Sequence, residues 1–401
     1  SMDSFSLFNI DATNVTEPLD VLELRASFVS PPVAYRGSFS CSDQALTRLW
    51  SVCRWATQIC LQTHHLDSPH HQEPISDPGD YLIASLVNYA TFFQPALTVQ
   101  DSRKYAWILG QCQNQVFHTS YALLWLQMVL DYYDHTGDDS LIRELAPAIH
   151  SLLDTFASYR GRNGLLSEAP NYMFLDWVEI AGFPGHHPPA VIGQGYMTAF
   201  FYRALADGIR VAEHLGDSAR ARKYARLRTE FAAAFERELW VEEKVLYRDG
   251  KPFQTSVKPG QWLPADKEIT TYTAHLQFLA ALYDLAPKER QAAIVEKAIT
   301  GPDFTCQPYF MHFVFAALAH VGLFEKYAPA QLRRWKVAEQ TQSLLEMWDR
   351  GDLSHSWGAT PLVQLTSRIL GGRPAAPGFT TVTIAPQPCG LTWAKGVVPT
   401  P

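Results

Sequence analysis

The segment Ser42-Asp-Gln-Ala-Leu-Thr-Arg-Leu-Trp-Ser-Val-Cys-Arg-Trp-Ala-Thr-Gln-Ile-Cys60 decides the fold, because its apolar side chains follow the period of an α-helix. Leucine, tryptophan, cysteine, alanine and isoleucine recur every three or four positions, and Ser42-Asp43 offers an N-cap. Similar segments follow along nearly the whole chain. The sequence therefore predicts a protein built mainly from α-helices.

The number and spacing of these segments narrow the architecture. About twelve helices are too many for a simple bundle, and no repeat of fixed period supports a solenoid. Long loops rich in Trp, Asp and His alternate with short ones. This alternation is expected for a closed ring of helical hairpins whose functional site lies at one end. The expected helices span residues 42–60, 81–93, 98–114, 120–136, 139–159, 193–215, 217–238, 268–285, 287–299, 308–321, 323–338 and 357–370, with a hairpin at 239–253.

Both ends of the chain alternate apolar and polar residues, which is typical of β-strands. Within residues 18–40, the run Val21–Phe28 predicts a strand that precedes a Pro-Pro turn. Residues 378–385 and 391–398 alternate in the same way and predict the start of a β-sandwich that is cut short.

Composition excludes several classes of partner. The 401 residues carry a net charge of −7 without a Lys/Arg run, which argues against nucleic acid. The sequence contains no run of eighteen apolar residues, so it predicts no membrane span. The six cysteines include no Cys-x-x-Cys pair, so we expect no disulfide framework. The sequence does not decide the cellular location. Because it shows no signal peptide and no disulfide pattern, the cytoplasm is favoured.

The loop Leu66-Asp-Ser-Pro-His-His-Gln-Glu-Pro-Ile-Ser-Asp-Pro-Gly-Asp80 is the strongest candidate for a functional site. Its prolines forbid a continuous helix, so it is expected to be irregular and to lie between two packed helices. Capping the next helix would need one carboxylate, whereas this loop has four. They are Asp67, Glu73, Asp77 and Asp80.

Two later segments combine carboxylates with tryptophan. Asp176-Trp177 lies in the first, and Glu346-Met-Trp348 lies in the second, which Ser354-His-Ser-Trp357 follows. Glycosidic cleavage needs one protonated carboxyl and one ionised carboxylate across the sugar, and aromatic walls hold the sugar faces. These loops therefore predict a glycosidase. The residues alone leave Glu346 and Glu179 open as the partner of Glu73.

Short phrases along the chain resemble those of one known family. They are Gly37-Ser-Phe-Ser-Cys-Ser-Asp43 with Leu49-Trp50, Asp67-x-Pro69 with Glu73 and Asp80, Leu123-Leu-Trp125 with Asp131-Tyr-Tyr133 and Thr136-Gly-Asp138, Asp176-Trp177, Glu346-x-Trp348, Ser354-His-Ser-Trp-Gly-Ala-Thr-Pro361, and the closing run Gly372-Arg-Pro, Pro377-Gly-Phe379, Trp393-Ala-Lys-Gly and Val398-Pro-Thr-Pro401.

The family that these phrases resemble is the catalytic domain of the inverting α-L-rhamnosidases, glycoside hydrolase family 78. The resemblance implies an all-α fold, a six-hairpin (α/α) barrel with short β-strand segments at both termini. It implies an exo-acting hydrolase that releases terminal α-L-rhamnose from glycosides or oligosaccharides, without a cofactor or metal. The expected units are residues 1–40, an N-terminal arm or the remnant of a preceding β-domain; 41–372, the catalytic barrel; and 373–401, the start of a truncated C-terminal β-sandwich.

The resemblance also implies roles for individual residues. Glu73 would be the general acid, and Glu346 the general base that activates water. Substrate contacts are expected from polar residues that hold sugar hydroxyls and from tryptophans that wall the pocket. These residues are Asp67, His71, Asp77, Asp80, Trp125, Asp176, Trp177, Trp348, His355 and Trp357.

Two positions depart from the family pattern. His71 stands where the family carries an arginine, so a bidentate fork is lost. Asp77 stands where a tryptophan is expected, which removes an aromatic wall and adds negative charge near Glu73.

These departures keep other functions open. One is a catalytically idle carbohydrate-binding barrel, and another is the same fold acting on a different deoxy sugar or an uronic acid. Zinc is not expected, because His64-His65 and His70-His71 are adjacent pairs without helical spacing and no cysteine joins them. The oligomeric state stays open.

Overall fold

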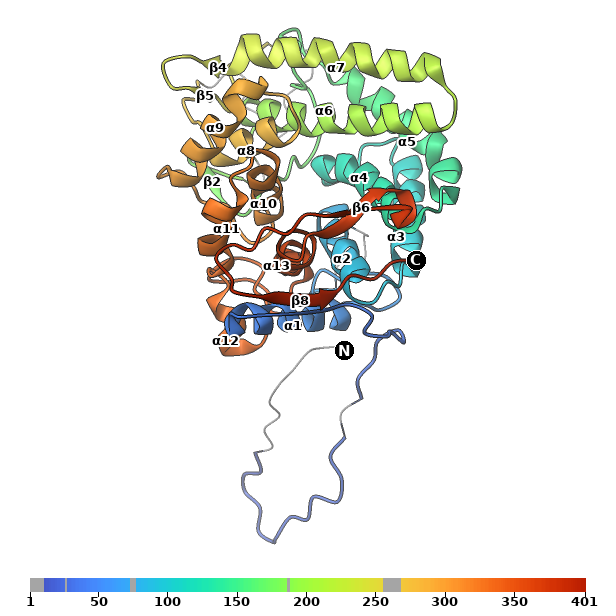
Figure 1. Ribbon diagram of the computed structural model, residues 1–401, viewed down its shortest axis with the longest axis vertical. Helices are drawn as coiled ribbons and strands as arrows, with labels where there is room; N and C mark the ends of the chain where they lie inside the picture. The colour runs from blue at the N-terminus through green and yellow to red at the C-terminus, as the bar shows by residue number, and fades with distance from the viewer. Residues whose placement is uncertain (1–10, 26, 73–76, 186–187, 255–267) are drawn as a thin grey trace.

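The chain folds, in the computed structural model, into a closed ring of helices (Figure 1). The structure describes residues 11–25, 27–72, 77–185, 188–254 and 268–401. Within them, each inner helix contacts the next, and the last, α13, returns to the first, α2. The inner helices are α2 (Pro78–Thr91), α4 (Thr119–Thr136), α6 (Ala190–His214), α8 (Ala274–Leu282), α10 (Met311–His320) and α13 (Thr360–Gln364).

A second layer of helices packs outside this ring. Outer and inner helices alternate along the chain as far as α11, and each outer helix to that point contacts an inner neighbour, as the long antiparallel pair α6 and α7 shows in Figure 1. The outer helices are α1 (Gln44–Ile59), α3 (Ala96–Gln111), α5 (Ser140–Ser158), α7 (Ser218–Leu239), α9 (Lys288–Thr300), α11 (Phe324–Leu332) and α12 (Lys336–Thr341). This arrangement confirms the predicted all-α barrel.

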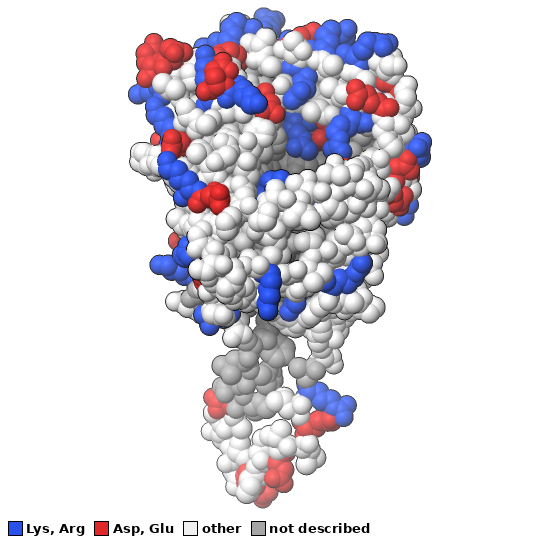
Figure 2. Space-filling model, in the orientation of Figure 1, with Lys and Arg blue, Asp and Glu red and all other residues white. Residues whose placement is uncertain are grey.

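Burial explains which helices lie inside. In α8 every residue except Leu282 is buried, as expected for a helix with neighbours on all sides. In α7 only one face, which includes Tyr224, Phe231 and Phe235, is buried. On the face shown in Figure 2, charged side chains of both signs cover the edge where α7 lies. Within the described residues, no helix combines the length and apolarity needed to cross a membrane.

In the part of the chain that the structure describes, four two-stranded antiparallel sheets supplement the helices. Strand β1 (Ser38–Cys41) pairs with β8 (Ala394–Val397) and also contacts α1, so the first and last strands of the structure lie side by side next to α1 (Figure 1). The other pairs are β2 (Glu179–Ile180) with β3 (Phe183–Pro184), β4 (Trp240–Val241) with β5 (Leu246–Tyr247), and β6 (Gly372–Ala376) with β7 (Thr381–Ile384). The β4–β5 pair confirms the hairpin expected at 239–253. The division of the chain into units at 1–40, 41–372 and 373–401 stays a prediction.

Three local predictions are wrong. The described residues of the expected strand at 21–28 form no strand, because they lie in an exposed arm without a pairing partner. The helix expected at 323–338 is split into α11 and α12, with buried Trp335 in the break, where its indole N–H donates to the Gly358 carbonyl at 2.9 Å. The helix expected at 357–370 combines a 3₁₀ turn (Ser356–Ala359), α13 and a π turn (Leu365–Ile369).

Loops at the two ends of the ring differ in length, as the sequence predicts. The loops that precede the inner helices span residues 60–77, 112–118, 159–189, 240–273, 301–310 and 342–355, whereas those that follow, at 92–95, 137–139, 215–217, 283–287 and 321–323, are short. The N-terminal ends of the inner helices therefore share one elaborated end of the ring, which we call the mouth. Their helix dipoles make this end favourable for carboxylates.

Closure of the ring generates the first prediction. The Trp50 indole N–H of α1 donates to the hydroxyl of Thr366 at 3.1 Å, and both residues are buried. Thr366→Val would leave this N–H without a partner, so the free energy of unfolding in urea should fall by about 1–3 kcal/mol. Ser367→Ala is the control, because the Ser367 hydroxyl bonds only within its own helical segment, to Val363. Equal stability of Thr366→Val and wild type would contradict the closing role of this bond.

Candidate active site

Two loops from opposite ends of the chain join at the mouth. The loop between α1 and α2 carries Asp67, and the segment between α12 and α13 carries Ser356. The Ser356 N–H donates to the Asp67 carbonyl at 2.8 Å, and its hydroxyl donates to the Leu66 carbonyl at 3.1 Å. The Cys60 thiol also donates to the Ser354 carbonyl, at 3.2 Å. These buried bonds hold the two loops together as one unit.

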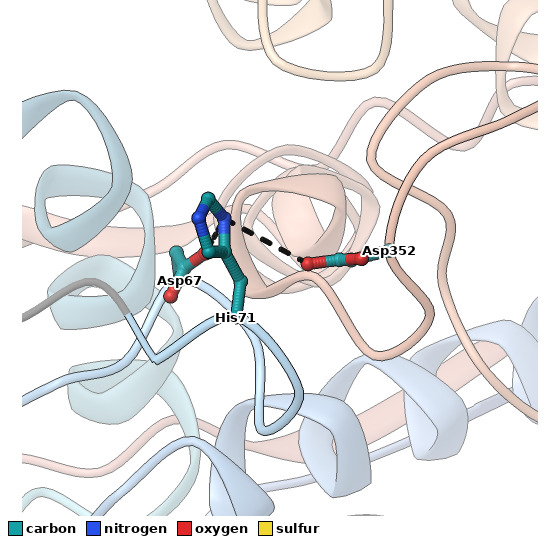
Figure 3. Close-up of side chains that lie close together, drawn as sticks. All are labelled: Asp67, His71 and Asp352. Carbon is teal, nitrogen blue, oxygen red and sulfur yellow. Dashed lines mark ion pairs between the residues drawn. The ribbon is translucent and has the colours of Figure 1, made fainter.

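Polar side chains from both loops converge beside this junction. Figure 3 shows His71 between the carboxylates of Asp67 and Asp352. The His71 Nδ1 lies 3.4 Å from Asp67 Oδ2 and 3.9 Å from Asp352 Oδ2. The Ser68 hydroxyl donates to Asp352 Oδ2 at 2.9 Å. The site therefore combines residues that are far apart in the sequence.

Glu346 is presented by a small hairpin next to this cluster. Its backbone N–H donates to the Asp352 carbonyl at 3.0 Å, and the Asp352 N–H donates to Glu346 Oε2 at 3.2 Å. The Trp357 indole N–H donates to the Glu346 carbonyl at 2.9 Å. Gly351 closes the hairpin with φ +89°, and a Cβ there would lie 2.5 Å from Glu346 Oε2. A side chain at 351 would therefore displace the carboxylate.

The surroundings of Glu346 favour its protonated form. Burial raises the pKa of the Glu346 carboxyl, and the hydrogen bond from the Asp352 N–H opposes this shift. The carboxylates of Asp352 and Asp67 raise the same pKa further, whereas His71 lowers it. The bond from the Asp352 N–H to the Glu346 carboxylate places Glu346 in the same site as this cluster.

His355 lies deeper, between the carboxylates of Asp67 in the first loop and Asp80 in the first turn of α2. Its Nε2 is 3.9 Å from Asp67 Oδ2, and its Nδ1 is 3.8 Å from Asp80 Oδ1. Burial lowers the pKa of His355 to about 3, so the imidazole is neutral near neutral pH. Its ring packs on Trp357 with the centroids 4.3 Å apart. A neutral imidazole can still donate one hydrogen bond to a hydroxyl.

Aromatic rings continue from His355 across the mouth. Trp357 packs against Tyr309 at 4.9 Å and Phe174 at 6.1 Å between ring centroids. Phe174 in turn contacts Trp177 edge-on at 5.7 Å. Trp348 belongs to a neighbouring group, because its indole N–H donates to the Cys306 carbonyl at 2.7 Å and Arg334 lies over its ring at 4.0 Å.

Comparison with known proteins identifies the family. Residues 34–302, more than half of the chain, match the family model described as the bacterial alpha-L-rhamnosidase 6 hairpin glycosidase domain. The chain belongs to this family. An alpha-L-rhamnosidase from Formosa agariphila is 20% identical over 430 residues, which cover 96% of this chain and 43% of that protein.

Solved rhamnosidase structures share the fold. A GH78 family rhamnosidase of Bacillus sp. GL1 superimposes with a TM-score of 0.81 and 26% identity, over 93% of this chain and 40% of that one. A Streptomyces avermitilis alpha-L-rhamnosidase complexed with L-rhamnose gives a TM-score of 0.69 and 16% identity, over 92% of this chain and 36% of that one. The chain therefore spans less than half the length of these relatives.

Two expected site residues of this rhamnosidase-family chain are buried against other protein groups, and a third cannot be placed. Trp125 is fully enclosed in the core, and its indole N–H donates to the Ser102 carbonyl at 3.0 Å, so the prediction that it walls the pocket is wrong. Asp77 is buried at the start of α2, with Oδ1 at 3.2 Å from His118 Nδ1. Glu73 lies outside the described residues.

Asp176 ties loops of the mouth together. It is fully buried, and its carboxylate accepts from the Trp177 N–H, the His275 Nε2 and the Gln307 N–H, each at 2.9 Å. Since three protein donors use this carboxylate, it is a structural tie rather than a free sugar ligand.

Sequence reasoning missed two groups that the fold brings into the site. Asp352 belongs to a Gly-Asp turn that looks like an ordinary solvated loop, and only the hairpin pairing directs it toward His71. His118 directly precedes α4, and no sequence motif around it marks it as a site residue. The exposed Glu179, by contrast, lies on β2, so the geometry favours Glu346.

The position of Asp176 generates the second prediction. Asp176→Asn keeps the shape but weakens charge-assisted bonds, so the free energy of unfolding in urea should fall by about 1–3 kcal/mol. Glu179→Gln, an exposed change on β2, is the control and should leave stability unchanged. If Asp176→Asn were as stable as wild type, the carboxylate would not be a structural tie, and the predicted sugar-binding role would return.

Proposed function

We propose that this chain is an exo-acting glycoside hydrolase that releases terminal α-L-rhamnose with inversion at the anomeric carbon. Membership of the rhamnosidase six-hairpin family is the observation that carries the reaction class. The contact between the Glu346 hairpin and the Asp67 loop supports the position of the reaction. Since the chain spans less than half of its relatives, the activity of this piece by itself is part of the proposal.

Two carboxyl groups would share the chemistry. Glu346 would act as the general base that removes a proton from the attacking water. Glu73, on the loop that joins Asp67 to α2, would protonate the leaving oxygen. The described start of that loop, residues 66–72, contacts the hairpin that carries Glu346, because the Ser68 hydroxyl donates to Asp352 Oδ2 at 2.9 Å.

Neighbouring groups would bind the sugar. Asp67, Asp80 and neutral His355 form a buried polar set that suits hydroxyl groups, because it offers both acceptors and a donor. The half-buried Trp177 would offer apolar ring surface to the sugar, and the buried Trp357 would support this aromatic wall from behind.

The roles of the two glutamates generate the third prediction. Glu73→Gln and Glu346→Gln should each lower the turnover of an aryl α-L-rhamnoside by about 10²–10⁴-fold, because each loses one proton transfer. The melting temperature should stay close to that of the wild type, and Glu179→Gln should retain full turnover. Wild-type turnover in either catalytic variant would remove that residue from the mechanism. Rhamnose-dependent thermal stabilisation without turnover in the wild type would instead favour an idle sugar-binding barrel.

The stereochemistry of the product generates the fourth prediction. Direct attack by water activated by Glu346 forms the product with the opposite anomeric configuration. Proton NMR during the first minutes of the reaction should therefore show β-L-rhamnose before mutarotation. Initial formation of α-L-rhamnose would indicate a covalent intermediate and would rule out the base role of Glu346.

A further inference from the structure

A cluster of ligand-type atoms lies beside the groups that hydrolysis would use. One atom each from Asp67, His71 and Asp352 lies within 4.8 Å of the other two (Figure 3). We propose that these three residues bind a divalent metal ion of the zinc or manganese class at the mouth. The sequence predicts no metal here, because only the adjacent histidine pairs are visible in it, whereas the fold brings Asp352 from the far end of the chain.

The spacing of the three atoms suits such an ion. Ligands at about 2.0–2.1 Å from a tetrahedral zinc ion are about 3.3–3.5 Å apart. The His71 Nδ1 lies 3.4 Å from Asp67 Oδ2 and 3.9 Å from Asp352 Oδ2. Both distances exceed the range of about 2.7–3.2 Å for a hydrogen bond. The shorter distance matches two ligands of one ion, and the longer one would have to shorten by about 0.4 Å when an ion binds.

One hydroxyl holds two of the ligands in place. The Ser68 Oγ donates to Asp352 Oδ2 at 2.9 Å and accepts from the backbone N–H of His71 at 3.0 Å. The backbone of Asp67 is fixed in turn, because its carbonyl accepts from the Ser356 N–H at 2.8 Å. Outer bonds of this kind orient metal ligands and are a usual part of metal sites.

The charges near the cluster also favour a cation. Asp67 and Asp352 add negative charge beside Glu346, and two nearby arginines make other contacts. The Arg350 guanidinium contacts the Met347 sulfur at 3.4 Å, and the Arg334 guanidinium lies over the Trp348 ring at 4.0 Å. A metal ion would add positive charge to a cluster that holds two carboxylates and one imidazole.

The cluster is open on one side. The Asp67 side chain is 3% exposed, Asp352 is 25% exposed and His71 is 62% exposed. The buried carboxylate would thus anchor the ion, while its remaining coordination positions would face the mouth. Water would fill them in the free protein. Neighbouring hydroxyls of a sugar could replace this water, a role that rests on the proposed function, whereas metal binding itself does not.

Isothermal titration of the chelator-treated chain with ZnCl₂, and separately with MnCl₂, tests the site. We expect one ion per chain for at least one of these metals, with affinity at least about tenfold weaker in His71→Gln and in Asp352→Asn. Asp349→Asn is the matched control, because it removes the same charge from an exposed position of the same hairpin and should bind like wild type. His71→Gln decides the question if Asp352→Asn misfolds, since His71 is largely exposed.

Two outcomes would overturn the metal site. One is no saturable binding of either metal, and the other is binding of equal affinity in wild type and His71→Gln. A parallel assay with an aryl α-L-rhamnoside separates the two proposals. Metal binding without turnover would refute only the proposed function, and turnover without metal binding would refute only the metal site.

Discussion

The structure depends on the closure of its helical ring between α13 and α2. This contact joins the last inner helix to the first, and the hydrogen bonds of Ser356 to Leu66 and Asp67 lie directly above it, at the mouth. Without closure, Asp67 and Asp352 would belong to two unrelated surface loops. A large shared core of inner helices drives closure, because their side chains are buried on almost every face.

Closure also concentrates negative charge. Asp67, Asp80, Glu346 and Asp352 meet where the inner helices begin, and the positive ends of the helix dipoles offset part of their repulsion. Burial and neighbouring carboxylates still raise the pKa of Glu346. Carboxyl groups with shifted pKa values are typical of sites that bind ligands, because groups that are already fully paired interact only weakly with a substrate or an ion.

The sequence predicts much of this fold because helix periodicity is a local property. The inner helix at 119–136 and the hairpin at 240–247 follow from side-chain patterns that each segment carries by itself. The strand expected at 21–28 fails because strand formation needs a partner that local alternation cannot reveal. Trp125 shows the same limit for sites, since a tryptophan in a leucine-rich helix has the same sequence pattern whether it faces the core or a pocket. The pairing of His71 with Asp352 could not be predicted, because it arises only when the ring closes.

A crystal structure of the chain soaked with L-rhamnose tests the central claim most directly, namely that ring closure creates one sugar site between the first and last mouth loops. We expect a sugar ring between Glu346 and Glu73, beside His355 and Asp67, with the two glutamate carboxyl groups about 6.5–9.5 Å apart. Rhamnose bound away from this junction, or the two carboxyl groups in separate cavities, would contradict it.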